Sequence, residues 1–250
     1  MRGISIRSWI QDRQARGSKK FPEAPLTPSR NVIKYFVMQS EVAIKDPHAA
    51  LFALLRGRAA ALPAPALLLL AAGCAAAFGA AVGSYTGGMQ ILYAAVKMPL
   101  YFLSTLGISF AALHVLAASR LPAGETLKAA SEAVALTAAA LGGLAPVVAF
   151  VSLSCRRPDQ ASYTFLILVL TASVAIGGLA GVARLHARIA SPGLTVAWVV
   201  IYQFTGAQMA WLLKPWVSYT FKADRFLPLH ENLHGNFYES IFGVLRSLLS

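Results

Sequence analysis

Charged residues are scarce in this chain. Asp, Glu, Lys and Arg together make up 13% of its 250 residues, whereas hydrophobic residues make up 57%. Soluble domains average about 25% charged and about 45–50% apolar residues, so the composition excludes a soluble globular domain and predicts that the excess apolar surface faces lipid. Cysteine is scarce as well, which excludes a disulfide scaffold. The two cysteines, Cys74 and Cys155, lie in or beside apolar runs and are predicted to be packing residues.

Acidic residues are rarer than basic ones. The chain has 22 Lys and Arg against 10 Asp and Glu, for a net charge of +12. The cations are spread over an N-terminal arm and flank apolar runs, without the basic stripe or recognition module of a nucleic-acid-binding protein. Attraction to anionic lipid headgroups, about 1 kcal/mol per basic residue near the surface, accounts for the charge. We therefore predict membrane lipids as partners and no nucleic acid.

Long intervals without a charged residue predict the architecture. A helix needs roughly 20 apolar residues to cross a bilayer, and the runs show no period-2 alternation, so the fold class is all-α, a polytopic membrane helix bundle. Five transmembrane helices are predicted, at residues 60–84, 98–118, 133–154, 161–183 and 193–213. Between the first two, polar residues 84–90 are interpreted as an exit loop, followed by a short amphipathic piece around residues 91–96 that leads to Lys97.

The basic residues also predict the orientation and the domain boundaries. Fifteen of the 22 Lys and Arg fall in the arm and in two loops on its side of the membrane. Short Lys/Arg-rich segments stay cytoplasmic, so we expect an N-in, C-out multi-pass protein of the bacterial inner membrane; the Arg156-Arg157 pair counts against this orientation. The arm has no early apolar run, so it is expected to be retained. The predicted parts are a flexible basic cytoplasmic tail (1–30), an amphipathic interfacial segment (31–58), the five-helix bundle (59–214) and an extracytoplasmic tail with a terminal amphipathic helix (215–250).

Small residues predict where the helices touch. Gly79 and Gly83 end the first predicted span, and Gly177 and Gly181 lie in the fourth, each pair with the Gly-x-x-x-Gly spacing that lets two helix backbones approach closely. Such spacing arises easily by chance in a chain rich in Ala and Gly. It therefore indicates a compact bundle and specifies no homodimer.

Polar residues inside the predicted spans are few. His114 is the only titratable side chain well inside an apolar run, and a hydrogen bond to a neighbouring helix is favoured over a proton relay. The fifth span carries a polar stripe that includes Gln203, Thr205 and Gln208. Together with His114 these residues form a candidate polar path, although hydrogen bonds between helices are the favoured explanation. Farther along, Trp211, Trp216 and Tyr219 are interpreted as an aromatic belt at the outer interface.

One motif suggests chemistry. His230 and His234 belong to an H-E-x-x-H sequence, which on a helix places two imidazoles to bind zinc, and Glu239 is the only carboxylate downstream that can serve as a third ligand. Pro228 and Gly235 leave less than two helical turns for the motif, and the C-terminal tail is too short for a protease domain. An interfacial helix capped by Asn236 explains the same stretch without a metal.

Three stretches together resemble a known group of proteins. These are residues 83–103 (GSYTGGMQILYAAVKMPLYFL), 203–217 (QFTGAQMAWLLKPWV) and 235–241 (GNFYESI). They resemble an uncharacterised bacterial family of five-span membrane proteins, and the layout with a long cytoplasmic arm is similar to that of the Yip family. The first resemblance implies no known activity. The second, an architectural analogy, implies a scaffold-like role in membrane organisation without catalysis.

The expected function follows from these features. The sequence has no P-loop, dinucleotide-binding, Cys-x-x-Cys or c-type haem motif, so no cofactor and no enzyme activity are predicted. We expect a non-enzymatic integral membrane subunit that anchors or organises a larger membrane protein complex, with other membrane protein subunits as partners. The alternative is the membrane component of a transporter, which the polar stripe in the fifth span favours. A second alternative is a zinc-dependent membrane hydrolase.

Overall fold

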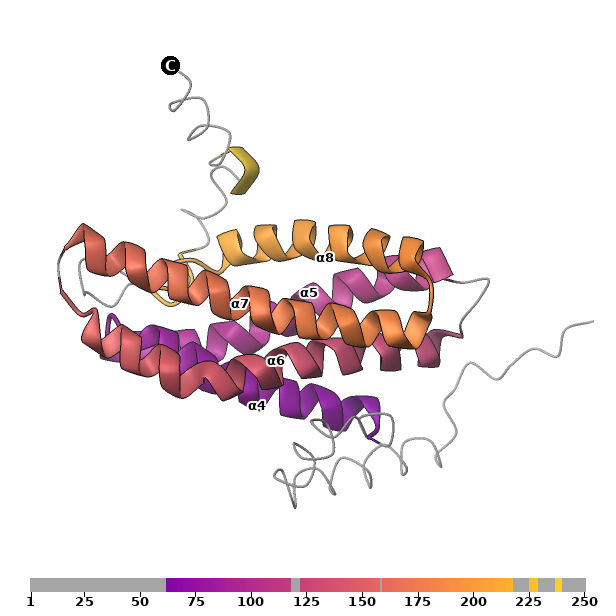
Figure 1. Cartoon of the computed structure of the whole chain (residues 1–250), viewed down its shortest axis with the longest axis horizontal. Helices are drawn as coiled ribbons and strands as arrows, with labels where there is room; N and C mark the ends of the chain where they lie inside the picture. The colour runs from indigo at the N-terminus through magenta and orange to yellow at the C-terminus, as the bar shows by residue number, and fades with distance from the viewer. Residues whose placement is uncertain (1–61, 118–121, 158, 218–224, 229–236, 240–250) are drawn as a thin grey trace, which may run out of the picture. The chain divides into compact units, whose positions relative to one another are not determined.

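The computed structural model describes residues 62–117, 122–157, 159–217, 225–228 and 237–239. Five long α-helices occupy most of these ranges, and no strand occurs within them (Figure 1). The helices are α4 (Ala64–Gly83), α5 (Met89–Ala117), α6 (Ala123–Ser154), α7 (Gln160–Ile189) and α8 (Pro192–Leu212). The predicted all-α fold class is confirmed for this part of the chain.

Four of these helices, α4 to α7, are long and apolar enough to cross a membrane. The chain is therefore a multi-pass membrane protein whose exposed apolar surface contacts lipid. Helix α8 has 21 residues and occupies the place of the fifth predicted span. It is not among the four helices that meet this criterion, because polar side chains such as Gln203 and Gln208 interrupt its apolar sequence.

Three of the five helices, α5, α6 and α7, extend beyond the charge-free intervals. Helix α5 begins at Met89 and continues without a break through Lys97, so the prediction of a separate amphipathic piece before the second span is wrong. Helix α6 begins well before the predicted third span and includes Glu125, Lys128 and Glu132. A charged side chain at the end of a span does not stop a helix when another part of the fold supplies its partner. The charge-free intervals thus mark the apolar segments and not the helix ends.

Consecutive helices run in opposite directions (Figure 1). Helix α4 packs against α5 and α6, α6 packs against α7, and α5 packs against α8. The contact between α7 and α8 is the least extensive of those between helices that follow one another in the chain. The turns after α4 and α6 lie at one end of the bundle. The turn after α7 lies at the opposite end, next to the C-terminal end of α5.

Glycines allow two of these helix pairs to approach closely. A Cβ atom added at Gly79 would overlap the carbonyl group of Ala94 on α5, and one added at Gly83 would lie 2.5 Å from the carbonyl oxygen of Gln90. On α7, Gly177 and Gly181 lie in the same way against the Leu141 and Thr137 region of α6, the latter in direct contact with the Thr137 hydroxyl. The four glycines singled out in the sequence therefore lie at contacts within one chain.

The turn between α4 and α5 is buried. Tyr85 and Thr86 are 0% and 2% exposed, although the sequence predicts an exit loop here. The guanidinium group of Arg156, which follows α6, donates a hydrogen bond to the Thr86 carbonyl oxygen at 3.1 Å. Gly87 has a φ of 80° and lies directly under this guanidinium group, so a side chain there would be both strained and obstructed. The turn closes one end of the bundle.

Candidate functional site

A buried cation organises the end of the bundle where α5 begins. The Lys97 side chain is 0% exposed, and its Nζ atom donates a hydrogen bond to the carbonyl oxygen of Pro215 at 3.0 Å. Gln90, also fully buried, donates from Nε2 to the same carbonyl oxygen at 3.1 Å and to that of Trp216 at 3.2 Å. The Phe226 ring lies 5.8 Å from the Lys97 ammonium group and adds a cation–π contact. We call Gln90, Lys97, Pro215 and Trp216 the Lys97 cluster.

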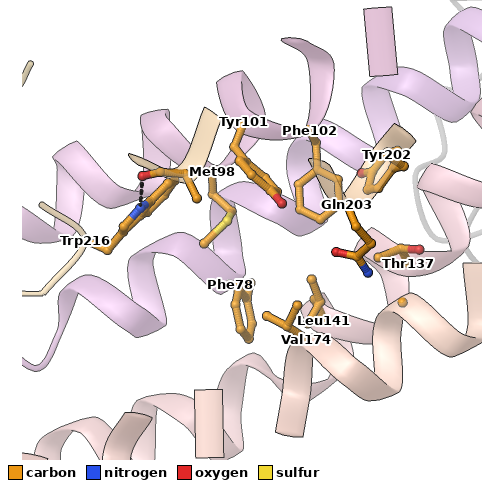
Figure 2. Close-up of a pocket in the computed structure, with 12 residues that line it drawn as sticks. Phe78, Met98, Tyr101, Phe102, Thr137, Leu141, Val174, Tyr202, Gln203 and Trp216 are labelled. Carbon is orange, nitrogen blue, oxygen red and sulfur yellow. Dashed lines mark hydrogen bonds between the residues drawn. The ribbon is translucent and has the colours of Figure 1, made fainter. Parts of the chain in front are cut away.

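The Lys97 cluster joins two of the stretches that carry the family resemblance. Residues 83–103 supply Gln90 and Lys97, and residues 203–217 supply Pro215 and Trp216. The Trp216 indole turns inward, packs edge-on against Tyr101 and donates from Nε1 to the carbonyl oxygen of Ala210 at 3.0 Å (Figure 2). The backbone after α8 folds back onto the bundle and brings this half-buried ring against α5, and the aromatic belt at the outer interface stays a prediction. Tyr219, another member of that belt, lies outside the described residues.

A second ionic cluster lies toward the opposite end of the bundle. Glu132 on α6 is 0% exposed, and its Oε2 atom lies 2.8 Å from Arg184 and 3.4 Å from Arg188, both on α7. Arg188 also lies 3.5 Å from the exposed carboxylate of Glu125. We call these four residues the Glu132 cluster. The sequence did not single out Glu132 or Lys97, because each stands at the edge of an apolar run where a solvated side chain was expected.

Between the two clusters lies a cavity of about 260 Å³ (Figure 2). Its wall is mostly aromatic and aliphatic and includes residues from all five helices together with Trp216. The apolar lining residues are Phe78, Met98, Phe102, Leu141, Val174, Ala210 and Trp216. The polar ones are Tyr101, Thr137, Tyr202 and Gln203. Gln203 reaches from α8 toward Thr137 on α6 (Figure 2), and no Asp, Glu, Lys, Arg or His lines the cavity.

A smaller cavity of about 50 Å³ adjoins the first one. The two share Thr137, Gly178, Tyr202 and Gln203 in their walls. The smaller one is also lined by Trp198, which is 4% exposed and whose ring stacks at 4.8 Å, tilted, on that of Tyr202. The Trp198 Nε1 atom is buried and has no hydrogen-bond partner among the described residues. Polar groups therefore gather where the two cavities meet.

The residues of the predicted polar path are not brought together. Gln203 lines both cavities, whereas Thr205 and Gln208 line neither of them. His114 lies near the C-terminal end of α5 and stacks on Phe110, one turn earlier, with 6.0 Å between the ring centroids. Its Nδ1 atom is buried without a partner in the described part of the chain. Tyr101, Thr137 and Trp198 complete the polar lining, and no spacing in the sequence links them to Gln203.

The predicted metal site falls almost entirely outside the described residues. Neither His230 nor His234 is described, and Glu239 is exposed in a short helical stretch, residues 237–239. The neighbouring Tyr238 stacks on Phe204 of α8 at 4.9 Å and donates to its carbonyl oxygen at 3.3 Å. Within the described ranges there is no group of three or more His, Cys, Asp or Glu that could hold a metal ion. The two cysteines are free, Cys155 buried and Cys74 half-buried.

The fold and the two clusters define an all-α, multi-pass membrane protein. No protein-family model, curated protein or solved structure was found to match the chain. The resemblance of its three stretches to a bacterial five-span family, and the Yip-like layout, therefore stay predictions.

Proposed function

We propose that the chain is a non-enzymatic integral membrane subunit that anchors or organises a larger membrane protein complex. The proposal rests on the partners of three ionic side chains of the described bundle, each of which binds a neighbouring segment of the same chain. Glu132 binds two arginines of the next helix, Lys97 binds the carbonyl group of Pro215, and Arg156 binds that of Thr86. These charges tie neighbouring segments together at the ends of the helices, which favours a rigid scaffold over a chain of proton- or ion-binding groups.

Helix α7 offers the surface for partner subunits. Only five of its 30 residues are buried: Leu166, Ser173, Gly177, Gly181 and Leu185. Large apolar side chains are exposed along the middle of the helix, among them Leu168, 62% exposed, and Leu179, 71% exposed. Lipid or a transmembrane helix of another subunit covers such a face equally well. We propose the latter, because a subunit that organises a complex needs a helix free to contact its partners.

Cross-linking in the native membrane tests this proposal. In a chain whose Cys74 and Cys155 are replaced by Ala, we place single cysteines at Leu168 and Leu179 and add a thiol-directed cross-linker. Covalent products with the same partner subunit at both positions, identified by mass spectrometry, are expected. Matched controls are Leu166→Cys and Leu185→Cys, which lie on the buried face of the same helix and should give none. If all four variants stay monomeric and the purified chain is monodisperse, the proposal is wrong.

For orientation, we propose five membrane passes, N-in and C-out, in the bacterial inner membrane. Helix α8 supports this count because it packs alongside α5 in the antiparallel sense, with Gly206 against the hydroxyl group of Tyr101 and Pro215 against Lys97. The two clusters lie at opposite ends of the bundle, with Glu132, Arg184 and Arg188 toward the side that the basic arm predicts to be cytoplasmic.

The cavities favour a second candidate, the membrane component of a transporter. A path for a solute needs polar groups inside the bundle, and Gln203, Tyr202 and Thr137 meet there. Uptake into proteoliposomes, measured for solutes of several classes, distinguishes the two candidates. The zinc hydrolase is a third candidate that rests on sequence alone. Its test is the zinc content of the purified chain before and after His230→Ala and His234→Ala.

A further inference from the structure

Several polar groups without a protein partner meet at the two cavities. The Trp198 Nε1 donor is buried and unpaired in the described structure. The Gln203 amide and the hydroxyl groups of Tyr101 and Tyr202 border the larger cavity, and none of them has a hydrogen bond to another described residue. Inside a membrane bundle an unsatisfied donor carries the full penalty of its lost hydration. A group of such donors around one space indicates that a molecule other than the protein satisfies them.

The wall restricts the chemistry of that molecule. No ionisable acid or base other than the two tyrosines lines either cavity, so the ligand carries no net charge. The Trp198 indole can only donate a hydrogen bond, and the two tyrosine hydroxyl groups and the Gln203 amide can donate as well, so an acceptor such as a carbonyl oxygen is the group that all of them can bind. The wall is otherwise aromatic and aliphatic, including Phe78, Phe102 and Trp216, and it suits an apolar body attached to that acceptor.

The volume of the larger cavity and its access from the bilayer restrict the size and kind of the ligand further. A cavity of about 260 Å³ lies just below the usual range of small-molecule pockets, about 300–1,000 Å³, and so admits a single ring or a short acyl segment. Gln203 is exposed, and so is its neighbour Phe204 on α8. Since Gln203 both lines the cavity and is exposed, we place the entry of a molecule dissolved in the bilayer beside α8, whose contact with α7 is the least extensive of the consecutive helix contacts.

We infer that the two adjoining cavities bind the carbonyl-bearing head of an uncharged, membrane-dissolved molecule. Its carbonyl oxygen accepts from Trp198, Tyr202 and Gln203 where the cavities meet, and its apolar part lies against Phe78, Phe102 and Trp216. Two sources supply this chemistry in a membrane, the ring of a prenylated quinone and the ester group of an acylglycerol. This inference goes beyond the proposed role as a complex subunit and does not depend on it.

The test uses the purified full-length chain in lipid nanodiscs. A short-chain prenyl benzoquinone is titrated while tryptophan fluorescence is recorded, since Trp198 and Trp216 line the cavities and quinones quench indoles on contact. In a second arm, dioctanoylglycerol competes with the quinone. Saturable quenching is expected from a quinone site, and displacement by the acylglycerol at comparable concentration shows that the ester is accepted as well. If the quinone does not saturate the signal, saturable binding of radiolabelled dioctanoylglycerol supports the acylglycerol as the source.

Variants distinguish specific binding of the probe in the cavities from its simple partition into the lipid bilayer. Tyr202→Phe keeps the ring that packs on Trp198 and removes only the hydroxyl group, and Gln203→Leu removes the amide. Each is expected to weaken binding about three- to tenfold, the loss of one hydrogen bond. The matched control is Gln208→Leu on the same helix, which lines neither cavity and should bind like the wild type. Non-saturable responses to both probes, or equal affinity in all three variants, would show that only water fills the cavities and would overturn the inference.

Discussion

The ammonium group of Lys97 lies 3.0 Å from the carbonyl oxygen of Pro215, a residue 118 positions farther along the chain. Gln90, two helical turns before Lys97, donates to the same oxygen at 3.1 Å. A single carbonyl group thus holds two buried donors and attaches the segment after α8 to the beginning of α5. Because Trp216 follows directly and lines the cavity, this attachment also positions one wall of the candidate ligand site.

Removing both donors to the Pro215 carbonyl oxygen should lower the free energy of unfolding by more than the sum of the two single losses. In Lys97→Met or Gln90→Leu, the carbonyl oxygen of Pro215 keeps one donor, and we expect each to lower the free energy of unfolding by about 1 kcal/mol. In the double variant that oxygen is left without either donor, so a further loss of about 1 kcal/mol is expected. Thermal unfolding in detergent, followed by circular dichroism, measures these differences. Strict additivity would show that the shared carbonyl contact contributes little.

The buried carboxylate of Glu132 should matter far more than the exposed one of Glu125. Glu132→Gln leaves Arg184, 21% exposed, without its closest anion. Breaking a fully buried pair lowers stability by about 3–5 kcal/mol, and we expect about 2–3 kcal/mol here because water reaches the arginine. Glu125→Gln is the control on the same helix; its 57% exposed side chain should contribute less than about 1 kcal/mol. Equal losses in chemical denaturation would contradict the assignment of Glu132 as the centre of the cluster.

Two glycines of α4 should respond oppositely to alanine. At Gly79 the new methyl group would overlap the backbone of Ala94, so α4 and α5 must separate and stability should fall by about 1–3 kcal/mol. At Gly73 no atom lies within 4 Å of the added Cβ, and Gly73→Ala should be neutral or stabilising by up to about 1 kcal/mol through helix propensity. Melting temperatures of the two purified variants provide the comparison. A loss at Gly73 as large as at Gly79 would mean that the close helix contact is not the cause.

The N-terminus of α7 should make stability depend on pH in the acid range. Asp159 accepts hydrogen bonds from the backbone N–H of Ser162 at 2.8 Å and from its hydroxyl group at 2.9 Å, and these bonds lower the pKa of the carboxyl group below its ordinary value of 3.8. A lowered pKa in the folded state stabilises the fold above the unfolded pKa. That contribution is lost as the pH falls through the folded value.

The wild type should therefore melt at a higher temperature than Asp159→Asn at neutral pH, and the gap should narrow below about pH 4. Melting curves of both proteins in one detergent, between neutral pH and about pH 3, measure this effect. A gap that stays constant over the whole range would show that the charge of Asp159 does not stabilise the start of α7.

The topology of α8 can be decided by the accessibility of its two ends. If α8 crosses the membrane, single cysteines at Ser191 and at Val217, in a chain with Cys74→Ala and Cys155→Ala, should react with a membrane-impermeant thiol reagent from opposite sides. We expect position 191 to be protected in intact cells and position 217 to be labelled. Labelling of both positions from one side would reduce the number of passes to the four helices that satisfy length and apolarity.

Much of the fold could be predicted from the sequence because apolar runs must be helical in lipid. All five predicted spans coincide with a helix, and both ends of α4 and of α8 lie within a few residues of the predicted ends. The N-terminal ends of α5 and α6 and the C-terminal end of α7 could not be placed, since Lys97, Glu132 and Arg184 lie inside these helices and pair with residues far away in the chain. A charge-free interval ends at a charged residue, whereas a helix continues through that residue as long as its backbone hydrogen bonds continue.

The candidate site, too, could be predicted from the sequence only in part. Gln203 could be singled out because an amide in an apolar helix is unusual, but its neighbours in the cavity, Tyr101, Thr137 and Trp198, are ordinary residues of three different helices. The inward turn of Trp216 depends on the backbone after α8 and on the acceptor that Ala210 offers. Nothing in the local pattern predicts that this tryptophan packs against α5.

By itself, the sequence determined that this chain is a bundle of membrane helices, because the scarcity of charge and the length of the apolar runs leave no other way to satisfy the backbone in lipid. The tertiary structure alone decided which charges are buried, which glycines touch a neighbouring helix and which polar groups share a cavity. These properties depend on pairs of residues from 52 to 118 positions apart in the chain, such as Glu132 with Arg184 and Lys97 with Pro215. Only the packing of the helices brings such pairs within hydrogen-bond distance.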